Sequence, residues 1–132
     1  HVCMPKVFRL SEQYLIRAEA RANQKNYSGA SKDLSDLRRA RFQGGNGTIS
    51  VSEQNWLEII EEERVRELYM EGFRLQDLKR WHKGFERKPQ EQSLTNGSSL
   101  KIEADDVRFV WPIPKHELES PGSQIQPNES NK

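Results

Sequence analysis

Apolar residues repeat at helical spacing near the start of the chain. Every fourth position of one stretch is apolar: Leu10, Tyr14, Ala18 and Ala22. Neither glycine nor proline interrupts residues 7–24, so this stretch is predicted to be a helix. Residues 26–29 have the composition of a turn, and a second helix is predicted over residues 30–41. Together the two helices predict an αα-hairpin.

Two further helices are predicted to follow this hairpin. Residues 44–47, three of which are glycine, break the chain because glycine tolerates positive φ angles. Ser52 is the expected N-cap of a third helix over residues 53–70. A fourth helix is predicted over residues 73–82. The expected fold class is therefore all-α, with at most short strands.

Most of the apolar residues precede residue 86, and this divides the chain. Residues 1–85 are expected to form a helical scaffold, and residues 86–132 a loop-rich segment packed on it. Within that segment, loops are predicted at residues 88–89 and 93–99, where Pro, Gly, Ser and Asn gather.

Regular structure is expected to return near residue 107. Residues 107–111 are β-branched and aromatic, which predicts a short edge strand or an extended segment that ends at Pro112. Residues 115–118 predict one helical turn. The polar tail from Ser120 is expected to lie along the surface or to fray.

The charges of the chain nearly balance. Its 132 residues carry 21 Lys and Arg against 20 Asp and Glu, so no broad basic surface favours nucleic acid. No apolar run approaches the roughly 18 residues that would span a bilayer, and the single cysteine, Cys3, permits no internal disulfide. We expect a soluble fragment of a longer protein whose targeting signal lies upstream.

Two carboxylates interrupt the apolar stripe of the third predicted helix. Five residues share this face at helical spacing: Trp56, Ile60, Glu63, Glu67 and Met70. An ionised carboxylate removed from water is costly unless it is paired, so both glutamates are expected to have cationic partners. Arg17 and Arg21 on the first helix are the expected partners, with Arg64, Arg74 and Arg80 as alternatives. The sequence thus predicts an interhelical Arg–Glu network.

Paired carboxylates allow two interpretations. They could be the general acid and base of a hydrolase, as in glycoside hydrolysis, or they could join helices. Joining helices is favoured because nearby arginines would hold both groups ionised, which suits neither an acid nor a proton shuttle. No catalytic residue is therefore predicted. The three histidines stand apart from other ligand-type residues, so no metal site and no cofactor is predicted.

Four segments resemble motifs of the SusD/RagB family, the surface lipoproteins with which Bacteroidetes-type bacteria capture nutrients. Residues 8–20 (FRLSEQYLIRAEA) are similar to the family's RLAEMYLIRAEA helix, and residues 30–41 to the helix that follows it. Residues 59–81 (IIEEERVRELYMEGFRLQDLKRW) are similar to the motif ERxxELxxEGxRxxDLxRW, and residues 111–118 (WPIPKHEL) to WPIPxxEL. The four segments occur in the family's order.

The resemblance implies a tetratricopeptide-like helical scaffold within a lipid-anchored protein at the outer-membrane surface. Such a protein binds an oligosaccharide or another nutrient, catalyses no reaction, and passes its ligand to a SusC-like TonB-dependent transporter. The membrane would be contacted only through a lipid anchor on the upstream part. Seven charged positions of the family map onto this chain, and the resemblance implies that they are structural: Glu63, Arg64, Glu67, Glu71, Arg74, Asp77 and Arg80.

The resemblance assigns no ligand-contact residue here, because the family's ligand contacts come largely from preceding segments. We therefore interpret the chain as the C-terminal part of a SusD/RagB-like glycan-binding protein. The main alternative is a free-standing helical-repeat domain that binds a protein or peptide in a groove. A carboxylate-based hydrolase fragment ranks below both.

Overall fold

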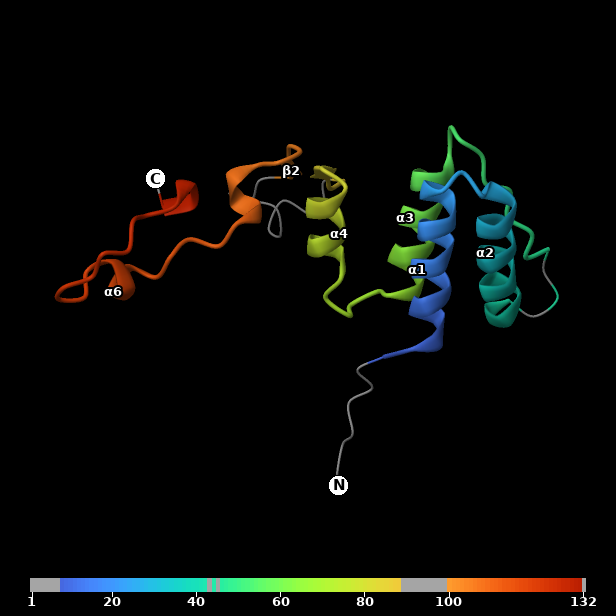
Figure 1. Ribbon diagram of the computed structural model, residues 1–132, viewed down its shortest axis with the longest axis horizontal. Coiled ribbons are helices and arrows are strands. Elements are labelled where there is room, and N and C mark those ends of the chain that lie inside the picture. Colours follow the sequence, from blue (N-terminus) through green and yellow to red (C-terminus); the bar gives the residue numbers. More distant parts are fainter. Residues whose placement is uncertain (1–7, 43, 45, 89–99, 132) are drawn as a thin grey trace, which may run out of the picture. The chain divides into compact units, whose positions relative to one another are not determined.

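The computed structural model describes residues 8–42, 44, 46–88 and 100–131, and it divides into two compact units. One unit comprises residues 1–72 and the other residues 73–132. Helices dominate the described residues, and the strands among them form one small two-stranded sheet (Figure 1). The predicted all-α class is therefore confirmed. The scaffold expected over residues 1–85 includes parts of both units, and that division remains a prediction.

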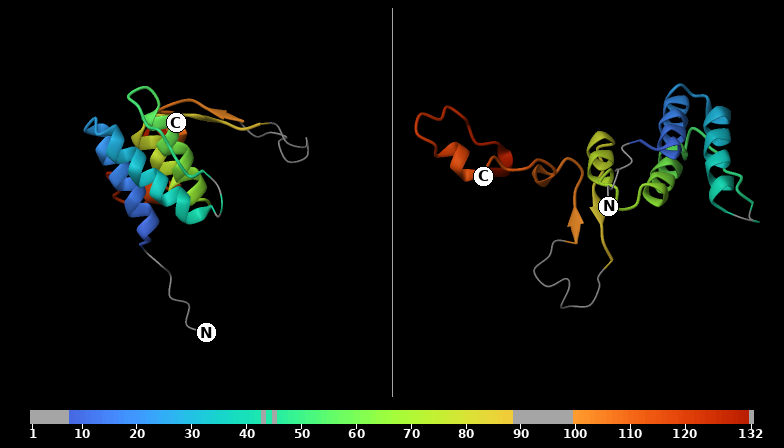
Figure 2. Two further views of the ribbon diagram at one scale, coloured as in Figure 1. Left: turned by 90° about the vertical axis from the view of Figure 1, so that its right-hand side faces the viewer. Right: turned by 90° about the horizontal axis from the view of Figure 1, so that it is seen from below.

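Three helices form the first unit: α1 (Leu10–Asn23), α2 (Tyr27–Arg41) and α3 (Trp56–Glu67). The helix α1 packs against both α2 and α3, as the views in Figures 1 and 2 agree. Small and aliphatic side chains are buried in these contacts: Leu15, Ala18, Ala22, Ala30, Leu34 and Ile60. The short alanine side chains let the helix backbones approach closely, because interaxial distance depends on the side chains at the contact.

The helix ends differ from the predicted ones for local reasons. Asn26 caps α2 by accepting a hydrogen bond from the Gly29 backbone nitrogen at 2.9 Å, so α2 starts at Tyr27 rather than Ala30. The predicted cap Ser52 is wrong, because α3 starts at Trp56 and the N-cap position is Asn55.

The C-terminal end of α3 is also earlier than predicted. The helix ends at Glu67, and Met70 has a φ of 60°, which an α-helix cannot continue through.

The chain between α2 and α3 is held along α2 by two serines. Ser35 Oγ accepts a hydrogen bond from the Ile49 nitrogen at 2.9 Å, and Ser31 Oγ accepts one from the Val51 nitrogen at 2.9 Å. Ile49 and Val51 are buried. The two serines are one turn of α2 apart, and through them residues 49–51 lie along that helix.

The second unit begins with α4 (Arg74–Arg80). The helix ends there because His82 has a φ of 53°, and the Lys83 nitrogen donates back to the Leu78 carbonyl at 2.9 Å. The helix predicted over residues 73–82 is therefore too long at both ends.

A short antiparallel hairpin follows α4. β1 (Phe85–Glu86) pairs with β2 (Lys101–Ile102), and Phe85 lies opposite Ile102. Residue 84 must be glycine, because a Cβ atom there would lie 2.2 Å from the Ile102 carbonyl oxygen. The loops predicted at residue 89 and residues 93–99 lie outside the described residues.

A 3₁₀ helix, η1 (Val107–Phe109), stands where a strand or extended segment was predicted. Asp106 caps it by accepting a hydrogen bond from the Arg108 nitrogen at 2.9 Å, and Phe109 is buried. Extended backbone begins only at Val110. The predicted helical turn at residues 115–118 is confirmed as α6 (Lys115–Leu118).

The polar tail returns to the rest of the second unit through η2 (Glu129–Asn131), which lies beside η1. The Asn131 carboxamide donates to the Ile113 carbonyl at 2.9 Å and accepts from the Ile113 nitrogen at 3.0 Å. Asn128 donates to the Trp111 carbonyl at 2.9 Å. Two asparagine side chains therefore fix the backbone of residues 111–113.

Candidate functional site

Glu63 of α3 lies between arginines of two helices. It forms ion pairs with Arg38 of α2 and with Arg66, which follows it by one turn of α3. The Glu63 side chain is only 7% exposed, so its charge is balanced within the protein rather than by water.

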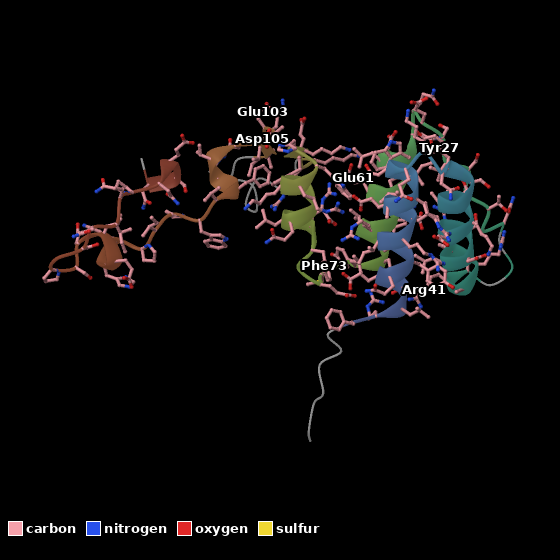
Figure 3. The ribbon with its side chains drawn as sticks, in the orientation of Figure 1. Tyr27, Arg41, Glu61, Phe73, Glu103 and Asp105 are labelled. Carbon is pink, nitrogen blue, oxygen red and sulfur yellow. The ribbon has the colours of Figure 1, made fainter. Side chains whose placement is uncertain are left out.

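Glu67 lies one turn further along α3 and binds two other arginines. Arg41, labelled in Figure 3 at the end of α2, donates from Nε to Oε2 at 2.9 Å. Arg9, which precedes α1, donates from Nη1 to Oε1 at 2.8 Å. Arg9 also binds Glu71, with Nη2 and Oε1 2.6 Å apart, and so connects two carboxylates.

These contacts keep Glu67 ionised. The hydrogen bond from Arg41 is the main cause that lowers the pKa of Glu67 from 4.5 to about 2. Burial opposes this change, whereas the hydrogen bond from Arg9 reinforces it. A carboxyl group that is ionised far below neutral pH has no proton to donate in a reaction near pH 7.

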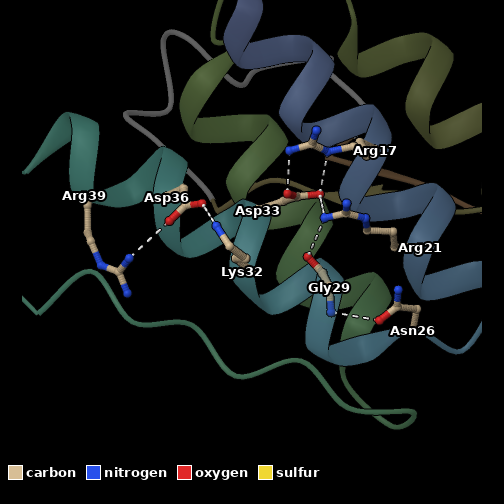
Figure 4. A network of polar contacts seen from close by, with 8 residues as sticks. All are labelled: Arg17, Arg21, Asn26, Gly29, Lys32, Asp33, Asp36 and Arg39. Atoms are coloured by element: carbon tan, nitrogen blue, oxygen red, sulfur yellow. Dashed lines mark hydrogen bonds and ion pairs between the residues drawn. The ribbon is translucent and has the colours of Figure 1, made fainter.

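A second buried carboxylate, Asp33 of α2, receives two arginines of α1 (Figure 4). Arg17 binds it through two hydrogen bonds, with Nη2–Oδ1 at 2.7 Å and Nε–Oδ2 at 3.0 Å. Arg21 Nη1 lies 2.7 Å from Oδ2 and also donates to the Gly29 carbonyl at 3.2 Å. The Asp33 side chain is 1% exposed, so these guanidinium groups replace its hydration.

The partners expected for the two glutamates were therefore wrong. Arg17 and Arg21 bind Asp33, for which no role was predicted, and not Glu63 or Glu67. The burial of Asp33 could have been predicted from helical spacing, because it lies on the same face of α2 as the buried residues Ala30, Leu34 and Leu37.

The other expected charged residues are distributed over both units. Arg64 is buried on α3. Asp77 of α4 is buried and binds Arg80 at 2.9 Å, while the Arg80 guanidinium lies 4.2 Å from the centre of the Trp81 ring. Arg74 lines a groove in the second unit. Whether all nine residues act as one structural network remains a prediction.

The second unit contains a groove of about 960 Å³, at the upper end of the roughly 300–1,000 Å³ of ligand pockets. Its walls are mostly apolar and include Leu78, Phe85, Phe109 and Trp111. The charged residues that line it are Arg74, Arg87 and Arg108, and no carboxylate lines it in the described part of the unit.

Two negative findings apply to the described residues only. No group of three or more His, Cys, Asp or Glu side chains in that part of the chain is placed to hold a metal ion. No helix there is both long enough and apolar enough to cross a bilayer.

The chain is thus an all-α protein. Carboxylates are buried between its packed helices, and each is bound by arginine side chains. The family model described as SusD family matches residues 4–129, and the chain therefore belongs to the SusD family. Its members are cell-surface nutrient-binding proteins. Comparison with curated proteins and with solved structures gives no significant match.

Proposed function

We propose that this chain is the helical framework of a SusD-type lipoprotein that captures a glycan at the cell surface and passes it to a SusC-like TonB-dependent transporter. The observation that carries the proposal is the family match over residues 4–129. Capture is non-covalent, and no residue of the chain transfers a proton or a group to the ligand.

The contacts of the first unit support the role of a framework. Three buried or nearly buried carboxylates, Asp33, Glu63 and Glu67, are each bound by arginines from a different segment. Removal of one partner from such a pair leaves an uncompensated charge, so the pairs favour one helix arrangement over others. The helices α2 and α3 meet at only a few other points, and the Arg38–Glu63 and Arg41–Glu67 pairs join them.

The location and the partner can be tested in the organism that makes the protein. The encoding gene is tagged, membranes are extracted in mild detergent, and the proteins that co-purify are identified by mass spectrometry. We expect a TonB-dependent transporter in near-equal amount, and we expect protease added to intact cells to remove the tag. A tagged protein that stays protected inside intact cells and co-purifies with no transporter would refute the proposal.

The ligand class is tested separately, by calorimetric titration of the purified protein with oligosaccharides. Binding of a glycan with no turnover supports capture. Selective binding of peptides with no glycan bound would instead support the alternative of a helical-repeat interaction domain.

A further inference from the structure

The groove of the second unit joins an exposed aromatic ring to guanidinium groups. Trp111 lines it and is 81% exposed, although a tryptophan side chain has a large apolar surface. Its backbone is held by Asn128, which donates to the Trp111 carbonyl at 2.9 Å. The ring is thus presented on a fixed backbone, which lowers the entropy lost when a ligand stacks on it.

Arg108, which also lines the groove, is held by Asp106 along one edge of its guanidinium group. Its Nε and Nη2 atoms each donate to Asp106, both at 2.8 Å, and Asp106 keeps a pKa of about 2, mainly because of this hydrogen bonding. A guanidinium group has two edges that can bind a carboxylate, so this pair leaves the edge formed by Nη1 and Nη2. Among the described residues only Asp106 accepts hydrogen bonds from the Arg108 guanidinium, and the side chain is 49% exposed.

Arg87 adds a cation on the same groove. Its guanidinium lies 5.5 Å from the centre of the Phe85 ring, and among the described residues it forms no ion pair with a carboxylate. The lining therefore combines apolar walls with guanidinium groups and includes no carboxylate among the described residues. This combination is complementary to a ligand with both an apolar face and a carboxylate.

We propose that this groove binds a carboxylate-bearing oligosaccharide, with the apolar face of a uronic acid ring on Trp111 and its carboxylate on Arg108 and Arg87. The inference rests on the proposed function, because it takes the ligand to be a glycan. A uronic acid has both features on each sugar unit, since its pyranose face is apolar and its acid group is charged at neutral pH.

The test uses short oligogalacturonides and the same oligosaccharides as methyl esters, titrated calorimetrically into the full chain. The esters keep the sugar ring and remove the charge. We expect the acid form to bind about tenfold more tightly or better, the effect of roughly one charge-assisted hydrogen bond. Trp111→Ala and Arg108→Gln are each expected to weaken acid binding by about tenfold, which is the loss typical of a central contact.

Matched variants separate these effects from changes in folding. Trp111→Phe keeps an aromatic face and should retain most of the affinity. Arg39→Gln removes an exposed arginine from the first unit and should bind as the unchanged protein does. Circular dichroism should give the same helix content for all four variants, and unchanged hydrogen exchange of the Phe109 and Val110 amides should show that η1 persists in Arg108→Gln.

The outcomes are distinct. Equal affinity for acid and ester, or unchanged acid binding by Arg108→Gln, would overturn the inference and leave glycan capture standing. Binding of neither sugar would also overturn it, while the transporter and location tests judge the proposed function independently. Binding of polyglutamate as tight as that of the acid sugar would overturn the assignment to a glycan and favour an acidic peptide.

Discussion

Replacement of Glu67 by Gln tests whether buried ion pairs determine the stability of the first unit. The change preserves the shape of the side chain but removes its charge. Arg9 and Arg41 then face a neutral amide, and the NH2 group of that amide cannot accept their hydrogen bonds.

The pKa of Glu67 sets the size of the effect. The fall of this pKa from 4.5 to about 2 means that the ionised Glu67 stabilises the folded state by at most about 3 kcal/mol at neutral pH. Arg41 and Arg9 are 51% and 27% exposed, so water screens part of this energy. We expect Glu67→Gln to lower the free energy of unfolding by about 2 kcal/mol.

The same pKa fixes the sign of the pH dependence. Because the folded-state pKa lies below the unfolded one, the contribution is complete above about pH 5.5 and is lost as the pH falls towards 2. The difference between the unchanged protein and Glu67→Gln should therefore shrink by about half between pH 7 and pH 3.5.

Urea unfolding of the full chain, followed by circular dichroism at several pH values, measures both quantities. Glu62→Gln is the matched control, because Glu62 lies on the same helix, binds Arg66 at 2.8 Å and is 56% exposed. The control should change stability by no more than about 0.5 kcal/mol. Equal effects of Glu67→Gln and Glu62→Gln, or a difference independent of pH, would refute the reasoning.

Three further predictions concern single contacts. Asp33→Asn should lower the free energy of unfolding in urea by about 2 kcal/mol, because it leaves two arginines facing a neutral amide. Asp36→Asn is the control: the Asp36 side chain is 31% exposed, so this change should cost about 0.5 kcal/mol or less. Gly84→Ala should separate β1 from β2, since its Cβ would lie 2.2 Å from the Ile102 carbonyl oxygen, and the loss of amide protection at β2 measured by hydrogen exchange would show it. Asn131→Ala should speed exchange of the amide at residue 113 without changing exchange in α1, because it removes both hydrogen bonds to that residue.

The starts of helices were predictable only where the cap is local. Asn26 caps α2 through Gly29, a contact that short-range sequence can indicate. Ser52 and Asn55 are both good N-cap residues, and the sequence alone favours neither strongly. Asn55 takes the N-cap position, but its side chain accepts a hydrogen bond from the Ser52 nitrogen at 2.7 Å and does not cap α3. The preceding chain is held along α2 by Ser31 and Ser35, and a contact between such distant residues cannot be predicted from a local pattern.

At residues 107–109 the prediction failed for a different reason, because a local hydrogen bond determines the structure against the β propensity of the residues. Valine and phenylalanine favour strands, but Asp106 accepts hydrogen bonds from the backbone and the side chain of Arg108. These hydrogen bonds stabilise the turn of η1, and they could not form if the backbone were extended. An aspartate directly before a short apolar run therefore indicates a turn, even where the β propensity of the run favours a strand.

Burial was predicted for Glu63 and Glu67, whereas their partners were not, and the reason is geometric. Helical spacing tells which residues share a face, but an arginine side chain spans several ångströms and can reach a neighbouring helix at more than one height. The partners follow once every buried acid is counted. Asp33 takes the two arginines of α1, so Glu63 and Glu67 must be bound by others, and the structure provides two guanidinium groups for each: Arg38 and Arg66, and Arg41 and Arg9. A sequence argument that omits one buried carboxylate therefore misassigns the partners of the remaining ones, even when it identifies those carboxylates correctly.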